Sequence, residues 1–167
     1  MMHRLAVPLA RGRVPPNALT LAGVAAAVAA VVTGRLVSAV LVLVTSVCDG
    51  LDGAVAIQRG RSSRRGTLID HSADRLTDVL FATALWHAGA DVWVALADAA
   101  LVLGYESARS LVRRRGSMPA RVTVGERPIR VAVTIIGIAV APTAGAAAVG
   151  LLCVAALVQM LTVRAGD

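Results

Sequence analysis

Apolar residues run through this 167-residue chain in long stretches rather than in one-sided stripes. A helix needs about 20 mainly apolar residues to cross a bilayer. Six stretches approach that length, and short segments rich in Gly, Pro or Arg separate them. The predicted helices cover 17–33, 36–58, 67–89, 91–112, 128–142 and 145–163. The predicted fold class is all-α: an integral membrane bundle of six transmembrane helices, after a short amphipathic segment at the N-terminus.

Arginine residues indicate the side of the membrane on which each connecting segment lies. Cytoplasmic loops of membrane proteins carry an excess of Lys and Arg. With the N-terminus inside, the outer turns hold only Arg35. The inner segments hold Arg4, Arg11, Arg13, Arg59, Arg61, Arg64, Arg65, Arg113, Arg114, Arg115, Arg121, Arg127, Arg130 and Arg164. We therefore expect one domain over 1–167, multi-pass in the cell membrane, with 1–16 as a cytoplasmic lead-in.

Composition agrees with a membrane protein and argues against a nucleic-acid binder. Hydrophobic residues make up 57% of the chain and mean hydropathy is +0.74. The net charge of +7 comes from arginines that lie mainly between apolar runs, and aromatic residues for base stacking make up only 2%. Cys48 and Cys153 both lie inside apolar runs, so we expect buried small side chains rather than a disulfide.

Four carboxylates interrupt the apolar pattern within residues 47–78. Asp49 and Asp52 are three residues apart, and Asp70 and Asp74 are four apart, so each pair shares one face of a helix. The two predicted helices are neighbours joined by a short loop, which lets the acidic faces meet. Gly53 and Ala56 lie beside the first pair and leave room for a bulky group.

Hard divalent cations are the natural compensation for carboxylates gathered at membrane depth, where an unpaired charge is strongly unfavourable. Mg²⁺ or Mn²⁺ takes oxygen ligands and is often shared with substrate phosphates, and two ions can clamp a phosphoryl group. His71 points about 100° away from Asp70, which favours a solvent or headgroup contact. Asp78 either supports the site or pairs with Arg75. An ion or proton pathway would explain the acids but not the small residues beside them.

The same stretch resembles the signature of the CDP-alcohol phosphotransferases, D-x2-D-G-x2-A-R-x8-G-x3-D-x3-D. Its spacing is kept from Asp49 through Gly66 to Asp74, and "PPNALT" resembles the family's opening of the first membrane helix. Ile57 stands where the motif has an Arg that helps to hold the nucleotide diphosphate, and Arg59 is no obvious replacement. The resemblance covers most of the chain and implies six spans with the site facing the cytoplasm.

The resemblance implies a reaction as well as a fold. The family transfers a phosphatidyl-type group from a CDP-linked lipid, commonly CDP-diacylglycerol, to an alcohol and releases CMP. By position, the four aspartates would bind one or two Mg²⁺ or Mn²⁺ ions, and Asp74 would also be the general base. The residues implied to lie against the CDP group are Asn17, Thr20, Gly53 and Ser63. A homodimer is expected from the family alone.

A second polar group lies in 104–131 and suggests a phosphate on the acceptor. Guanidinium forks bind phosphate through two hydrogen bonds, which makes Arg109, Arg127 and Arg130 candidates, whereas Arg113 to Arg115 read as topology anchors. "GERPIR" resembles the G-x-x-E-R-x-x-R element of family members that use phosphorylated polyols, notably inositol phosphate. "GYESAR" resembles their S-Y-x-K-A-R, with Ser107 in place of the Lys. Glycerol 3-phosphate is the alternative acceptor, and an ion-coupled transporter or an inactive relative are the alternative functions.

Overall fold

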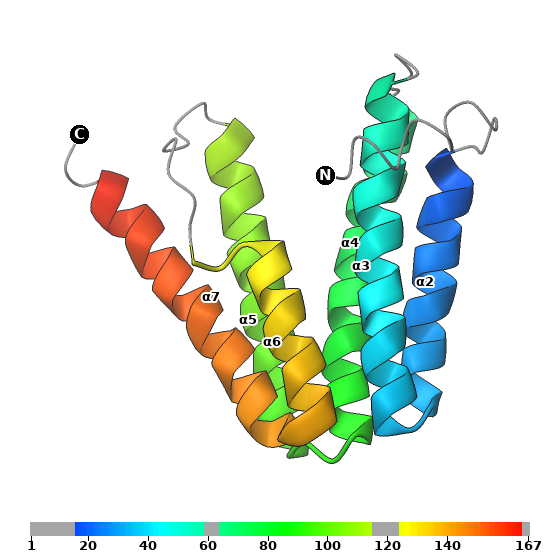
Figure 1. Ribbon diagram of the computed structural model, residues 1–167. Coiled ribbons are helices and arrows are strands. Elements are labelled where there is room, and N and C mark those ends of the chain that lie inside the picture. Colours follow the sequence, from blue (N-terminus) through cyan, green and yellow to red (C-terminus); the bar gives the residue numbers. More distant parts are fainter. Residues whose placement is uncertain (1–15, 59–63, 115–123, 165–167) are drawn as a thin grey trace. The chain divides into compact units, whose positions relative to one another are not determined.

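The computed structural model describes residues 16–58, 64–114 and 124–164, and all regular structure within them is helical. Figure 1 shows the six helices in chain order. They are α2 (Pro16–Val32), α3 (Arg35–Gln58), α4 (Arg64–His87), α5 (Val92–Arg114), α6 (Arg127–Val140) and α7 (Pro142–Arg164). The all-α prediction is confirmed, and each helix matches one predicted apolar stretch.

Two of these helices contain segments long and apolar enough to cross a membrane, Arg35–Val55 and Pro142–Thr162. A shorter apolar helix covers Asn17–Val32. The count of six crossings stays a prediction, because α4 and α5 carry several charged side chains and α6 has only 14 residues. At a rise of about 1.5 Å per residue, α6 is roughly 21 Å long.

Short local signals set the turn between α4 and α5. Gly89 has φ 110°, a conformation that glycine adopts without strain. Its N–H donates to the carbonyl of Trp86, and the N–H of Ala90 donates to the carbonyl of Leu85, both at 2.9 Å. This pattern is a Schellman ending of α4. Asp91 then caps α5, because its Oδ1 accepts hydrogen bonds from the backbone N–H groups of the second and third residues that follow it, at 2.9 and 3.1 Å.

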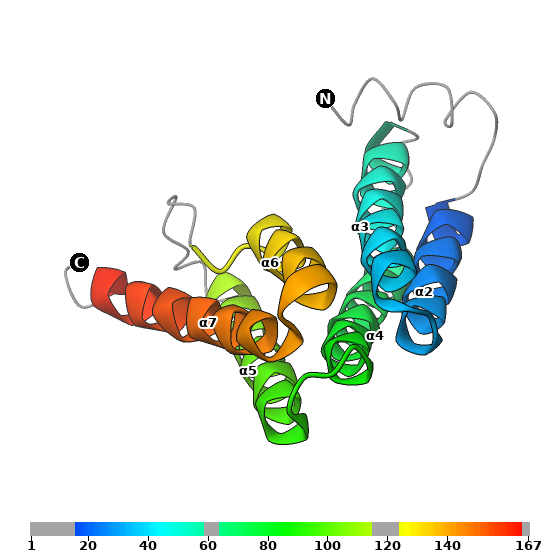
Figure 2. The ribbon, with the colours of Figure 1, turned by 60° about the horizontal axis from the view of Figure 1, so that its bottom comes forward.

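The chain forms two compact units, residues 1–81 and 82–167, and α4 runs from one into the other. In the first unit α2 and α3 pack side by side, as Figures 1 and 2 both show. Small residues make this contact close. The hydroxyl of Thr45 donates to the carbonyl of Gly23 at 3.1 Å, and a Cβ on Gly23 would lie 3.3 Å from that of Cys48. Close approach of this kind is typical of helices that pack within membranes.

The second unit packs α5 and α6 against α7. Its core contains Val102, Tyr105, Val149, Cys153, Ala156 and Met160. The burial of Cys153 confirms the expectation of a small apolar side chain, whereas Cys48 is half-buried. Helices α6 and α7 meet at two glycines, because a Cβ built on Gly145 would lie 2.5 Å from the Cα of Gly137.

Large apolar side chains are exposed along the helices. On α3 the side chains of Leu36 and Val40 are 74% and 58% exposed, and on α7 those of Leu151 and Leu161 are 68% and 67% exposed. Apolar surface repeated over several turns of both helices marks an interaction site in a soluble protein and a lipid-facing surface in a membrane protein. Lipid contact fits these surfaces of α3 and α7, because both helices are long and apolar enough to span a membrane.

Replacing Gly145 by Ala should destabilise the second unit. The new methyl group would overlap the backbone of Gly137, and overpacking of this kind costs about 1–3 kcal/mol. We expect a lower melting temperature for the purified protein in detergent. Gly104→Ala is the matched control, because a Cβ at Gly104 on α5 meets nothing within 4 Å and Ala favours a helix. Equal melting temperatures for the two variants would contradict the close α6–α7 contact.

Candidate active site

Four aspartates gather in the first unit at neighbouring turns of α3 and α4. Asp49 and Asp52 lie on α3, and Asp70 and Asp74 lie on α4. Carboxylate oxygens of Asp49, Asp52 and Asp70 all lie within 4.8 Å of one another. Asp52 is buried, with 4% of its surface exposed, and the other three are half-buried. The structure therefore brings together, through Asp70, the acidic faces that the sequence places on two helices.

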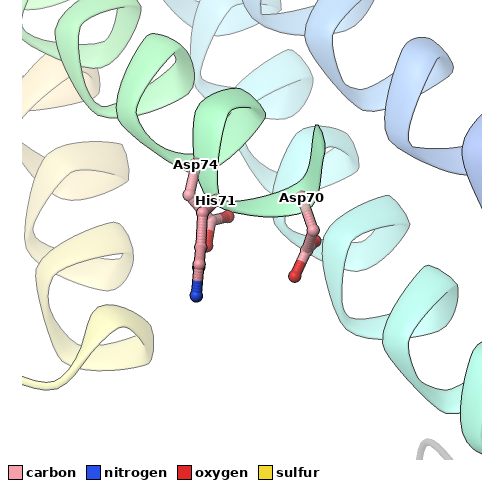
Figure 3. A group of neighbouring side chains, drawn as sticks. All are labelled: Asp70, His71 and Asp74. Atoms are coloured by element: carbon pink, nitrogen blue, oxygen red, sulfur yellow. The ribbon is translucent and has the colours of Figure 1, made fainter. Parts of the chain in front are cut away.

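His71 belongs to a second group of possible ligand atoms. A ring nitrogen of His71 and carboxylate oxygens of Asp70 and Asp74 lie within 4.8 Å of one another. Figure 3 shows the three side chains leaving the same turn of α4, with His71 beside Asp74. The His71 side chain is exposed, as expected, yet it does not point away from the acids. Neighbouring helix positions are about 100° apart. That angle gives the direction of the Cβ atom but not how far the imidazole ring reaches, so it did not predict the approach of His71 to Asp70 and Asp74.

Thr20 connects α2 to the acids on α3 and α4. Its hydroxyl on α2 donates a hydrogen bond to Oδ2 of Asp52 at 2.5 Å. Thr20, Asp49 and Asp52 also line a small pocket, whose other lining residues are Gly23, Val24, Thr45, Ala73 and Thr77. The sequence placed Thr20 at the donor group, and the structure places it at the buried carboxylate. Thr45 and Thr77 were not foreseen, because an isolated Thr in an apolar helix carries no sequence signal.

The remaining donor-side candidates are only partly described. Asn17 lies at the start of α2, one turn before Thr20, and is exposed. Gly53 is also exposed, and a Cβ built on it would contact nothing within 4 Å. The backbone beside Asp52 is therefore open to a bulky group, as the sequence suggested. Ser63 and Arg59 lie outside the described residues.

The ligand types in this group fit a hard divalent cation. Four carboxylates supply oxygen atoms, which Mg²⁺ and Mn²⁺ prefer, and His71 adds one nitrogen. The hydrogen bond from Thr20 holds Asp52 in one orientation, as outer partners of metal ligands commonly do. Asp78, one turn beyond Asp74, is buried and lies 4.0 Å from a guanidinium nitrogen of Arg75, so the pairing suggested by the sequence is present.

The arginines predicted for the acceptor lie in the second unit and differ from one another. Arg130 on α6 is 3% exposed and donates to Oε1 of Glu106 on α5 at 2.8 Å. Arg109 on α5 is 3.6 Å from Oε1 of Glu126, just before α6. Arg127 is half-buried in the first turn of α6. Sequence reasoning treated the three as one set and missed both glutamates.

Comparison with known proteins identifies the family. The family model for CDP-alcohol phosphatidyltransferase matches residues 13–163. The archaetidylinositol phosphate synthase of Aeropyrum pernix is 36% identical over 125 residues, which are 68% of this chain and 62% of that protein. The phosphatidylinositol phosphate synthase of Mycobacterium bovis is 36% identical over 93 residues, 50% of this chain and 43% of that protein. The chain thus spans about half the length of the curated relatives it matches.

Solved structures show the same fold. The crystal structure of the Mycobacterium tuberculosis phosphatidylinositol phosphate synthase with manganese and citrate has a TM-score of 0.76 at 23% identity, covering 97% of this chain and 88% of that chain. The same protein with CDP-DAG bound gives 0.71 at 25% identity, covering 97% and 90%. A family model that matches nearly the whole sequence and the grouped aspartates of its signature agree: this chain belongs to the CDP-alcohol phosphatidyltransferase family.

Proposed function

We propose that this chain is a membrane enzyme that transfers a phosphatidyl-type group from a CDP-linked lipid, such as CDP-diacylglycerol, to a phosphorylated polyol and releases CMP. One observation carries the proposal: carboxylate oxygens from α3 and α4 lie within 4.8 Å of one another at the family's signature positions. The relatives named as inositol phosphate lipid synthases and the CDP-DAG complex support the donor and the reaction type.

Asp49, Asp52, Asp70 and Asp74 are the residues that would hold the divalent cations, Mg²⁺ or Mn²⁺, and two ions are proposed because Asp70 belongs to both ligand groups. The manganese complex of the mycobacterial synthase supports the choice of metal. Bound cations neutralise the donor's diphosphate and stabilise charge on the transferred phosphoryl group. Thr20 keeps the buried Asp52 turned toward the group.

Asp74 is the proposed general base. It accepts the proton of the acceptor hydroxyl while that oxygen forms a bond to the lipid-linked phosphorus of the donor. The bond from this phosphorus to the CMP oxygen breaks, and CMP leaves with the electron pair. A base must lie within hydrogen-bond reach of the hydroxyl, and Asp74 is half-buried, so part of its surface can meet an incoming acceptor.

The donor is proposed to lie along the N-terminal part of α2 and the exposed Gly53. Asn17 and Thr20 are one helical turn apart, so both can face the same nucleotide. The hydroxyl of Thr20 donates to Oδ2 of Asp52, which places Thr20 beside the proposed metal ligands. The open space at Gly53 admits the diphosphate close to the backbone. Ser63 completes the set by motif position.

The acceptor is proposed to carry its own phosphate, bound by arginines of the second unit, Arg109, Arg127 and Arg130. Inositol phosphate is the first candidate, because the curated relatives make inositol phosphate lipids. Glycerol 3-phosphate is the alternative, since Ser107 replaces the Lys of the element that resembles theirs. The proposed setting is one multi-pass domain with its active site facing the cytoplasm, and a homodimer by family resemblance.

Asp74→Asn should abolish most of the activity. The substitution removes a base and a metal ligand together, and a positioned base contributes about 10²–10⁴-fold in rate. The measurement is CMP release from labelled CDP-diacylglycerol at saturating Mg²⁺, with inositol 1-phosphate present. Asp91→Asn is the matched control, because Asn caps a helix as well as Asp does. Near-normal turnover of Asp74→Asn would show that another group takes the proton.

His71→Ala should change metal preference. Imidazole suits Zn²⁺, whereas carboxylates suffice for Mg²⁺. We expect Zn²⁺ affinity to fall at least about tenfold, while Mg²⁺ affinity stays within about twofold, by titration calorimetry of the purified protein. His87→Ala is the control, since His87 packs against Trp86 in the second unit. An unchanged Zn²⁺ affinity for His71→Ala would leave the imidazole with a solvent contact only.

Arg127→Ala should raise KM for the acceptor with little change in KM for the donor. Losing one charged contact to phosphate corresponds to about tenfold to a hundredfold in affinity. The acceptor screen includes inositol 1-phosphate, glycerol 3-phosphate, free inositol, glycerol and serine. Arg113→Ala is the control, because Arg113 is exposed near the end of α5. Efficient use of an unphosphorylated alcohol by both variants would leave these arginines as topology anchors.

A further inference from the structure

Two arginine–glutamate pairs connect α5 to the start of α6, and they cross between the helices. Glu106 and Arg109 are three residues apart on α5, and Glu126 and Arg130 are four apart at α6, spacings at which charges usually pair within one helix. Here Glu106 contacts Arg130 and Glu126 contacts Arg109. Each arginine therefore meets the carboxylate of the other segment, and the two pairs hold the segments together.

Arg130 is held on three sides. Its Nη2 donates to Glu106 at 2.8 Å, and its Nη1 donates to the carbonyl of Gly125 at 3.1 Å. The guanidinium carbon lies 5.5 Å from the centre of the Tyr105 ring, which has no exposed surface. A buried guanidinium with these contacts is neutralised and fixed in place, and an incoming phosphate would have to break a charge-assisted hydrogen bond to reach it.

Arg109 is held loosely by comparison. Its Nη2 lies 3.6 Å from Oε1 of Glu126, which is an ion pair but too long for a hydrogen bond. Its Nε is buried and has no hydrogen-bond partner within the described residues. The guanidinium therefore has donor capacity left, in a place where an unused donor is unfavourable. An oxyanion with several oxygens would satisfy this fork better than the single distant carboxylate does.

Glu126 can move away without disturbing α6. It is the N-cap residue of α6 with extended backbone angles, and its side chain makes no capping hydrogen bond. The backbone around it is fixed by other contacts: a Cβ on Gly125 would lie 2.6 Å from that of Ala156, and the N–H of Val124 donates to Gln159 at 3.3 Å. The carboxylate is 31% exposed, so solvent can receive it.

We propose that Glu126 is a specificity residue that occupies the anion-binding side of Arg109 and is displaced by the acceptor's phosphate. This inference rests on the proposed function, which supplies a phosphorylated acceptor. A dianionic phosphate can displace the carboxylate, whereas a neutral alcohol leaves the ion pair closed. Discrimination against unphosphorylated alcohols then has two sources: the attraction of Arg109 for phosphate, and the Glu126 carboxylate, which competes for the same guanidinium.

The test is Glu126→Gln in the full chain, purified in detergent. Gln keeps the shape and removes the charge that competes for Arg109. Pairs this exposed contribute little, which corresponds to about a twofold to fivefold fall in acceptor KM for inositol 1-phosphate or glycerol 3-phosphate, with donor KM unchanged. Glu126→Asp, which keeps the charge, is the matched control, and its acceptor KM should stay closer to that of the unchanged protein. Glu126→Ala is a second neutral variant and should change KM in the same direction as Gln.

A binding measurement without turnover separates this proposal from the proposed function. Inorganic phosphate should raise the melting temperature of the unchanged protein, and Glu126→Gln should reach half of that rise at about twofold to fivefold less phosphate. If no acceptor releases CMP, the proposed function fails and this titration still decides the role of Glu126. Equal or weaker phosphate binding by Glu126→Gln would overturn the proposal.

A pair of arginine variants checks the role of Arg109. Arg109→Lys should raise acceptor KM roughly tenfold with a small change in melting temperature, because Lys lacks the planar fork. Arg130→Lys should lower the melting temperature more than Arg109→Lys does, because it weakens the 2.8 Å contact between a buried guanidinium and the half-buried Glu106. An unchanged acceptor KM for Arg109→Lys would overturn the proposal.

Discussion

Repulsion among four carboxylates is the constraint on which the first unit depends. Asp52 is buried and the other three are half-buried, so water screens them incompletely. Glycine and threonine bring α2 close enough to α3 for the hydroxyl of Thr20 to reach Asp52. The packing of α2 on α3 therefore fixes the orientation of Asp52, and the cations proposed for this site would supply positive charge beside it.

In the second unit, charged side chains are paired with one another. The buried Arg130 pairs with Glu106, and the half-buried Arg109 pairs with Glu126. Removing Glu106 would leave the buried Arg130 without its carboxylate partner, so this pair also ties the start of α6 to α5. Charge balance by a bound ion suits a site that must meet a diphosphate, and charge balance by glutamate suits a site that must stay closed until an anion arrives.

Much of this fold could be predicted from the sequence, because apolar runs, Pro142 and Gly89 are local signals for helices and their ends. The spacing of Asp49, Asp52, Asp70 and Asp74 likewise predicted which acids meet. Side-chain partners were harder. The reach of His71 depends on its rotamer, and the exchange of glutamate partners between α5 and α6 depends on how two helices pack. The helical spacing of residues in the sequence predicts neither property. Ser63 lies outside the described residues, so its role stays a prediction.

The shortness of α6 has a consequence for the surrounding lipid. A helix of 14 residues covers only about two thirds of a hydrocarbon core that is roughly 30 Å thick. Its neighbour α7 has 23 residues, and the apolar side chains of Ile136 and Val140 on α6 are 62% and 73% exposed. In a multi-pass arrangement this hydrophobic mismatch favours a locally thinned leaflet beside α6. Bilayer thickness then becomes a physical variable that acts on the helix carrying Arg127 and Arg130.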